Sequence, residues 1–224
     1  PLLQGKDTTI AGVITKIIVV GTYAYMSVNS ATSYDLKVMN VSTPSNMQFW
    51  GHTNFTAASP QDIFVTSTGT RAYLVTTANA DREFFVLDTS AVFSCSSNCG
   101  NTVFPVLGSY EANGMSAKGV TVVTNNRAII VGTGAEEYQV LNIENLGSIT
   151  RCGGLNIDTG VNGVASFIEA DGDAYSYIIT GDASAEFKII AGGAGGAGYA
   201  SSGTFESNTL DSLSSAAFNR FDVS

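Results

Sequence analysis

A short segment that recurs four times is the feature that most constrains this sequence. Each copy has an acidic residue, then a large apolar residue, one variable residue and two aliphatic residues. The copies lie in segments 34–41, 82–89, 136–143 and 185–191. Their apolar anchors, Leu36, Phe84, Tyr138 and Phe187, follow one another at intervals of 48, 54 and 49 residues. A period of this length predicts one supersecondary unit that is copied along the chain.

Each copy is preceded by two further segments rich in strand-forming residues. The nearer segments are 23–28, 71–76, 127–132 and 176–180, and the farther ones are 16–20, 62–66, 119–123 and 165–169. Between them lie turn signals at 21–22, 68–70, 125–126 and 171–173, where Gly, Asn and Asp tolerate the positive φ of tight hairpins. Candidates for a fourth strand follow at 47–51, 103–110 and 149–155. Each unit therefore predicts a meander of up to four strands.

Several of these segments are apolar on both faces, as at 128–131 and 189–190. The strands of a sheet with one solvent-exposed face alternate apolar and polar residues, whereas those of a sheet covered on both faces do not. The pattern favours an all-β fold of stacked sheets over a single open sheet. The architecture that we expect is a β-propeller of about four four-stranded blades. A β-sandwich also buries both faces of some strands, so the pattern distinguishes it from a propeller less clearly. Propellers have four to eight blades. Both a closed four-blade ring and part of a larger propeller are consistent with the sequence.

The repeat defines the expected domains. Residues 1–191 are the propeller repeats, with units at about 7–57, 58–114, 115–160 and 161–191. Residues 1–6 are expected to be an outermost strand, because they resemble 105–108, and the fourth unit lacks such a strand. They would complete either that last blade or a missing one. A Gly-rich linker is expected at 192–203, followed by a β-strand tail at 204–224.

The repeated strand, the Ala-Tyr strand before it and the Asn-Val-Ser-Thr-Pro turn at 40–44 resemble the LVIVD-type repeat. That resemblance covers roughly residues 1–191 and implies a β-propeller of bacterial or archaeal surface or secreted proteins. The second unit departs from the pattern by an insertion at 95–99, and the fourth lacks the Asn/Asp and the Pro. The tail resembles the opening strands of β-sandwich modules found after propellers, and the whole arrangement is similar to large pilin-like surface proteins.

Charge and cysteine usage narrow the partners and the compartment. The formal net charge is −9, which disfavours nucleic acid and anionic membranes, and no apolar run is long enough for a membrane helix. No direct membrane insertion is therefore expected in this segment. Charged residues make up only 13%, so Ser, Thr, Asn and Gly must cover the surface, as is common outside the cell. Cys95 and Cys99 are a disulfide candidate in a polar loop, with free thiols as the alternative, and Cys152 is expected to be a buried or partly buried apolar residue.

No catalytic or metal site is expected. His52 is the single histidine and is expected to be solvated, so a Ser-His-Asp triad and a zinc site are both disfavoured. The pair Glu136 and Glu137 should point to opposite faces of a strand, and the turn at 171–173 is at most a weak calcium site.

For two sets of residues, the sequence leaves two interpretations open. The repeated acids Asp35, Glu83, Glu137 and Glu186 could form a cation-binding ring or could each cap their own blade, and the aromatics Phe49, Trp50 and Phe55 could form a binding patch or pack between blades.

These observations predict a non-catalytic extracellular surface or appendage protein. It would act through protein–protein contacts, adhesion or self-assembly, and it would need no cofactor. Strand addition by an unpaired tail would provide one route to assembly. A carbohydrate-binding module, with glycans as partners, is the first alternative. A propeller-fold glycosidase or lyase is the second, and it requires acids that converge in a central funnel.

Overall fold

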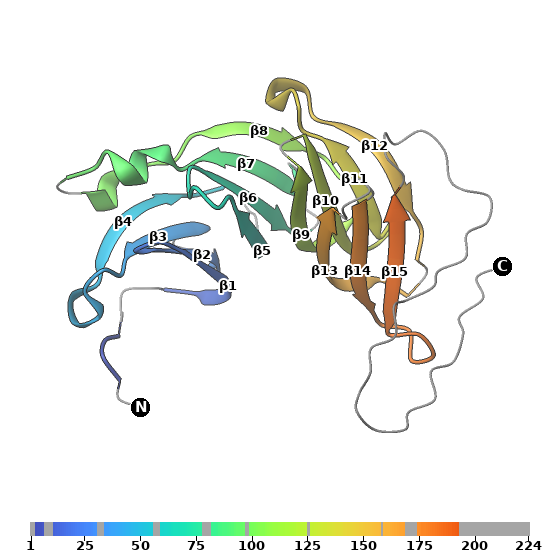
Figure 1. Cartoon of the computed structure of the whole chain (residues 1–224), viewed down its shortest axis with the longest axis horizontal. Helices are drawn as coiled ribbons and strands as arrows, with labels where there is room; N and C mark the ends of the chain where they lie inside the picture. The colour runs from blue at the N-terminus through green and yellow to red at the C-terminus, as the bar shows by residue number, and fades with distance from the viewer. Residues whose placement is uncertain are drawn as a thin grey trace.

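The computed structural model describes residues 3–6, 11–30, 34–55, 59–77, 82–96, 99–124, 126–157, 159–168 and 174–192. Over these residues the protein is all-β, and the only helices are short 3-10 turns. The strands form four antiparallel sheets, and in each sheet the strand order in space follows the order in the chain. The predicted all-β class and the four-unit meander are therefore confirmed (Figure 1).

The first three sheets have four strands and the last has three. The first sheet is β1 (Val13–Val20), β2 (Tyr23–Asn29), β3 (Leu36–Asn40) and β4 (Gln48–Thr53). The second is β5 (Pro60–Val65), β6 (Arg71–Thr76), β7 (Phe84–Asp88) and β8 (Val106–Tyr110). The third is β9 (Ser116–Thr124), β10 (Arg127–Thr133), β11 (Tyr138–Asn142) and β12 (Thr150–Leu155), and the fourth is β13 (Val161–Ile168), β14 (Ala174–Thr180) and β15 (Phe187–Gly192).

Tight turns join the first two strands of the first and second sheets where the sequence predicts them. Gly21 has a φ of +58° between β1 and β2, and Gly69 has a φ of +71° between β5 and β6. Glycine adopts this left-handed conformation without a steric cost, which explains its place at both turns. The corresponding signals at residue 125 and at 171–173 lie outside the described residues.

The fourth strands share one irregularity. Each carries a bulge, and the residue after the bulge is a glycine that pairs with an aliphatic residue of the third strand. The pairs are Gly51 with Val38, Gly108 with Val86 and Gly153 with Val140. Short 3-10 turns precede these strands: η1 (Pro44–Asn46), η2 (Ser90–Phe93) with η3 (Cys99–Asn101), and η4 (Leu146–Ser148). The repeat thus extends to local backbone detail.

Successive sheets pack face to face with β1, β5, β9 and β13 next to one another, and the four sheets follow an open arc (Figure 1). A separate apolar core fills each of the three junctions. Tyr25 and Leu36 meet Ile63 at the first, Tyr73 and Phe84 meet Ile130 at the second, and Tyr138 meets Ile178 at the third. The two middle sheets are therefore covered on both faces, as the apolar pattern predicts. The described sheets do not close into a ring.

Most of the predicted C-terminal segments, and part of the predicted N-terminal strand, lie outside the described residues. Residues 3–6 lie beside the first sheet and form no strand, while residues 1–2 and 193–224, with nearly all of the expected linker and the whole tail, lie outside them. Gly192, the first residue of the expected linker, belongs to β15. Within the described part, β15 pairs with β14 alone.

Two equivalent phenylalanines provide a matched test of sheet packing. Phe84 is fully buried between the second and third sheets, whereas Phe187 at the same repeat position is 59% exposed. We expect Phe84→Ala to lower the free energy of unfolding by about 3–5 kcal/mol through lost burial and the cavity that remains. Phe187→Ala should change it by about 0.5 kcal/mol. Urea unfolding of both variants at low protein concentration measures the difference, and equal losses would contradict the described packing.

Candidate functional site

Three of the repeated acids are buried and bind the backbone of their own sheets. An Asp35 carboxylate oxygen accepts the Phe55 N–H at 2.5 Å, Glu83 accepts the Ala112 N–H at 2.7 Å, and Glu137 accepts the Ile157 N–H at 2.8 Å. In each case the donor lies two residues after the fourth strand ends. Each carboxylate therefore ties the start of its third strand to the chain that leaves its sheet.

Glu186 holds the same repeat position but is exposed. Its sheet has no fourth strand among the described residues, so no equivalent backbone donor is in place. The backbone contacts of Asp35, Glu83 and Glu137 match the alternative in which each acid caps its own unit rather than joining a ring of cation ligands. Within the described part of the chain, no three His, Cys, Asp or Glu side chains come together in a group that could hold a metal ion. The turn at 171–173, the weak calcium candidate, lies outside the described residues.

The neighbouring acids Glu136 and Glu137 take different partners, as their adjacent positions predict. Glu137 binds the Ile157 N–H in a buried position, while Glu136 forms a two-pronged ion pair with Arg151 at the surface. The two carboxylates do not share a site. This geometry offers no paired acid and base for glycoside hydrolysis at these residues.

Asp62 is a half-buried acid that the repeat pattern did not single out. One of its oxygens accepts the Val120 N–H of the third sheet at 3.1 Å, and the other lies 3.7 Å from Lys16 Nζ of the first sheet. Burial raises the pKa of Asp62, although the Val120 N–H and Lys16 lower it in part. The side chain therefore joins three sheets along their innermost strands. Only the tertiary structure brings these partners together, because they are 58 and 46 residues away in sequence.

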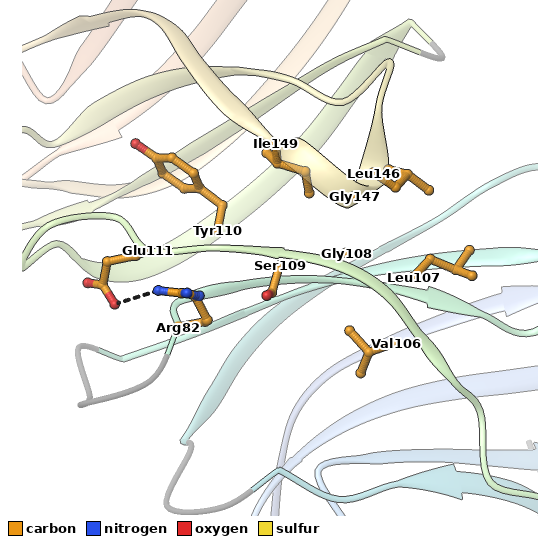
Figure 2. Close-up of a pocket in the computed structure, with 10 residues that line it drawn as sticks. All are labelled: Arg82, Val106, Leu107, Gly108, Ser109, Tyr110, Glu111, Leu146, Gly147 and Ile149. Carbon is orange, nitrogen blue, oxygen red and sulfur yellow. Dashed lines mark ion pairs between the residues drawn. The ribbon is translucent and has the colours of Figure 1, made fainter.

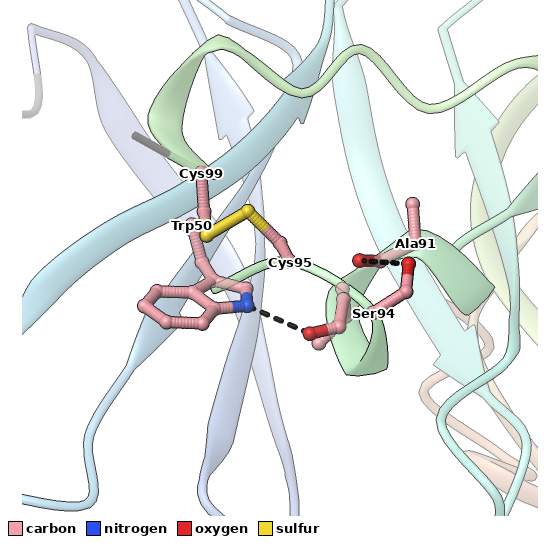
Figure 3. Close-up of a disulfide and its surroundings, with 6 residues drawn as sticks. Trp50, Ala91, Ser94, Cys95 and Cys99 are labelled. Carbon is pink, nitrogen blue, oxygen red and sulfur yellow. Dashed lines mark hydrogen bonds between the residues drawn. A yellow bond between two sulfur atoms is a disulfide. The ribbon is translucent and has the colours of Figure 1, made fainter. Parts of the chain in front are cut away.

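The predicted disulfide between Cys95 and Cys99 is confirmed (Figure 3). It joins the ends of the loop between η2 and η3, next to Trp50. Trp50 Nε1 donates to the Val92 carbonyl at 2.8 Å, which ties the first sheet to the insertion of the second. A shallow hollow of about 410 Å³ lies here, lined by Phe49, Trp50, Cys99 and neighbouring polar residues.

His52 is half-buried, so the expectation of a solvated histidine is wrong. The centroid of its ring lies 3.9 Å from the ring centroid of Tyr34 and 5.7 Å from that of Phe49. Its Nδ1 lies 3.1 Å from the Gly100 carbonyl oxygen. The insertion of the second unit covers it, and sequence spacing could not show that. Phe55 stacks on Phe85 of the second sheet at 4.1 Å. The aromatics of this region are therefore largely engaged in packing between sheets.

Cys152 is exposed, in contrast to the expectation of a buried or partly buried residue. It is the bulged residue of β12, between Arg151 and Gly153, which pair with Leu141 and Val140. The thiol donates to the Val140 carbonyl of β11 at 3.4 Å. Trp50 and Leu107, the bulged residues of β4 and β8, are half-buried against the next sheet, so the bulge alone does not place Cys152 at the surface.

A groove of about 490 Å³ lies between the second and third sheets, where β8 runs beside η4 (Figure 2). Its walls include Tyr110 and Ile149, and an ion pair of 3.7 Å between Arg82 and Glu111 lies at one end. Burial and the nearby Glu83 raise the pKa of Glu111. The Tyr110 hydroxyl donates to Gln139, which holds it within the structure.

The outward face of the fourth sheet carries a cluster of exposed apolar side chains, and we call it the end face. It comprises Phe167, Tyr177, Ile179, Phe187 and Ile189. Phe167, Ile179, Phe187 and Ile189 are 42–59% exposed, and Tyr177 is half-buried among them. The three rings stack across the strands, with centroid distances of 5.7 Å and 6.0 Å. Aromatic pairs at such distances are common in protein cores and interfaces.

Comparisons with known proteins found no family model that matches this chain and no similar curated protein. Among the residues that the structure describes, no helix has the length and apolar character needed to cross a membrane.

The repeated acids provide a matched pair of substitutions. Glu83→Ala leaves the buried Ala112 N–H without its acceptor, and we expect it to lower the free energy of unfolding by about 1–3 kcal/mol. Glu186→Ala at the exposed equivalent position should change it by about 0.5 kcal/mol or less. Urea unfolding at pH 7 measures both variants. A large loss in Glu186→Ala would show that this carboxylate has a structural partner.

The stability of the protein should also depend on the ionisation of Asp35. Burial raises its pKa to about 6, while the Phe55 N–H lowers it in part. Because the unfolded carboxyl ionises at about pH 4, the contribution of Asp35 to stability is present below that pH and falls as the pH rises to about 6. Asp35→Asn keeps an acceptor oxygen and removes the charge, so its stability relative to the wild type should increase between pH 4 and pH 7.

Asp88→Asn is the control of opposite sign. Hydrogen bonds from Ser90 lower the pKa of Asp88, so this carboxylate stabilises the fold at neutral pH and loses that effect on acidification. Denaturant midpoints measured across the pH range would distinguish the two. A pH-independent difference between Asp35→Asn and the wild type would contradict the raised pKa.

Proposed function

We propose that this chain is a non-catalytic surface or appendage protein that acts outside the cell through protein–protein contacts. The observation that carries the proposal is the end face of the fourth sheet. Large apolar side chains there occupy repeat positions that are buried in the other sheets. An extended apolar patch at the surface of a soluble protein is typical of a protein interaction site.

The comparison of equivalent positions separates this face from ordinary surface residues. The anchors Leu36 and Phe84 are fully buried, while Phe187 is 59% exposed. Ile179 is exposed where its counterparts Val75 and Val131 are fully buried. The end face therefore has the composition of an inter-sheet core without a described sheet against it. A protein surface of similar shape and apolar character is the ligand that it fits best.

Other observations support a role in binding rather than catalysis. The buried acids Asp35, Glu83 and Glu137 are each bound to backbone N–H groups of their own sheets. The Cys95–Cys99 disulfide is consistent with an oxidising compartment. We further propose that the sheets are blades of a propeller-like assembly of the LVIVD type. Their meander order and the adjacent innermost strands support that arrangement.

The end face can be tested with a charged substitution. Phe187→Asp should reduce the binding of the chain to protein-coated surfaces, or to itself, by at least tenfold, since burying an unpaired carboxylate against an apolar partner is costly. Val103→Asp, at another exposed apolar residue away from this face, should leave binding unchanged. Biolayer interferometry measures attachment, and circular dichroism checks the fold. Equal binding of Phe187→Asp and the wild type would contradict the proposal.

A further inference from the structure

The same inter-sheet interface occurs three times within the chain. Each sheet presents a forward face to the sheet that follows it and a backward face to the sheet that precedes it. At the second junction, for example, Phe84 and Val86 of a forward face contact Val120 and Ile130 of a backward face. The same strand positions meet at the first and third junctions. An interface that repeats in this way leaves one forward face and one backward face at the two ends of the arc (Figure 1).

Both ends of the arc have exposed apolar residues at the positions that the junctions bury. The forward face at one end is the end face, with Phe187 and Ile189. The backward face at the other end has Ile17 and Val19 of β1, which are 53% and 58% exposed. Their counterparts in β5, Ile63 and Val65, are 2% and 7% exposed. The uncovered part of the first sheet lies on β1, because Met47 and Phe49 pack on the rest of this face.

Residues 3–6 have the environment of a fourth strand that belongs to a preceding sheet. A Cβ added to Gly5 would lie 1.7 Å from the Pro44 carbonyl oxygen of η1. Gly108 of β8 has the same relation to the next sheet, since a Cβ there would lie 2.2 Å from the Leu146 carbonyl oxygen of η4. The preceding sheet that would receive residues 3–6 is absent from the described residues. Within the described part of the chain, the sheet that lacks a fourth strand is the last one.

The register of this missing pairing follows from the other sheets. The glycine of each fourth strand pairs with an aliphatic residue of the third strand, as Gly108 does with Val86. The next residue of the fourth strand then pairs with the preceding residue of the third strand, as Ser109 does with Phe85. On β15 the equivalent partners are Ile189 for Gly5 and Lys188 for Lys6.

We propose that the fourth sheet binds the first sheet of a second copy of this chain, head to tail, and that residues 3–6 of that copy add to β15 as its fourth strand. This inference rests on the proposed function and identifies its partner. A second copy offers both missing parts at once, because one molecule carries the exposed backward face and the strand that follows from it. The edge of β15 gains a partner for its backbone groups, and the end face gains an apolar cover.

The choice of a second copy over closure within one chain follows from the arrangement of the sheets. The first sheet and β15 lie at opposite ends of the open arc, so residues 3–6 do not reach β15 of the same molecule (Figure 1). The contact uses different faces on its two sides and is therefore heterologous. Such contacts produce a closed ring where the rotation closes and a filament where it does not.

Cysteine cross-linking between two separate chains tests the pairing. One full-length chain carries Lys6→Cys and the other carries Lys188→Cys, both with Cys152→Ser to remove the exposed thiol. The Cα atoms of directly opposed residues in an antiparallel pair lie about 4.5–5.5 Å apart, within the range of about 4.4–6.8 Å that a disulfide spans. We expect a disulfide-linked heterodimer from the mixture on a non-reducing gel, and at least tenfold less when Val103→Cys replaces Lys6→Cys.

A third chain with both substitutions distinguishes the alternatives. Cross-linked dimers and longer species support the second-copy proposal, and adding Phe187→Asp should reduce them at least tenfold. An internally linked monomer would show that the ring closes within one chain and would overturn the proposal. No cross-link in either arrangement would also overturn it, including the case in which residues 193–224 cover the end face. If cross-linking fails while Phe187→Asp still reduces attachment to protein-coated surfaces, the proposed function stands and the second copy does not.

Discussion

The apolar contact between successive sheets is the interaction on which the rest of this structure depends. Each four-stranded meander has large apolar side chains on both faces, so a single unit cannot bury them alone. Val86 and Leu87 are neighbours in β7 and point to opposite faces, yet both are fully buried. One packs toward the third sheet and the other toward the first. Stability therefore comes from the neighbours of a unit as much as from the unit itself.

This dependence explains the role of the repeated acids. Apolar faces hold the sheets together, but the ends of each sheet must satisfy buried backbone groups. Asp35, Glu83 and Glu137 do so by accepting one N–H each from the segment that leaves the sheet. Burial destabilises an ionised carboxylate, and the Phe55 N–H offsets only part of this cost at Asp35, so the pKa of Asp35 is raised. The acids fix where each unit ends and the next begins.

The sequence predicted much of the fold and less of the candidate sites. The second strands were located to within about two residues, because a period of about fifty residues repeats the same strands and turns. The disulfide of Cys95 and Cys99 was predicted from its short spacing. His52 and Cys152 were misjudged for different reasons. An insertion 48 residues later in the chain covers His52. Cys152 is exposed, whereas Trp50 and Leu107 at the equivalent bulges pack against the next sheet. Asp62 was missed because its partners belong to two other sheets.

Local order is what the sequence by itself determined about this protein. It specified the strand sequence, the hairpin turns at Gly21 and Gly69, and the position of the acid before each third strand, because these depend on residues close together in the chain. Only the tertiary structure decided which copy of a repeated residue is buried. Phe84 and Phe187 occupy the same place in the pattern, yet one is fully buried and the other is 59% exposed. The physical reason is that burial depends on the sheet alongside, and the pattern within a unit contains no information about its neighbours.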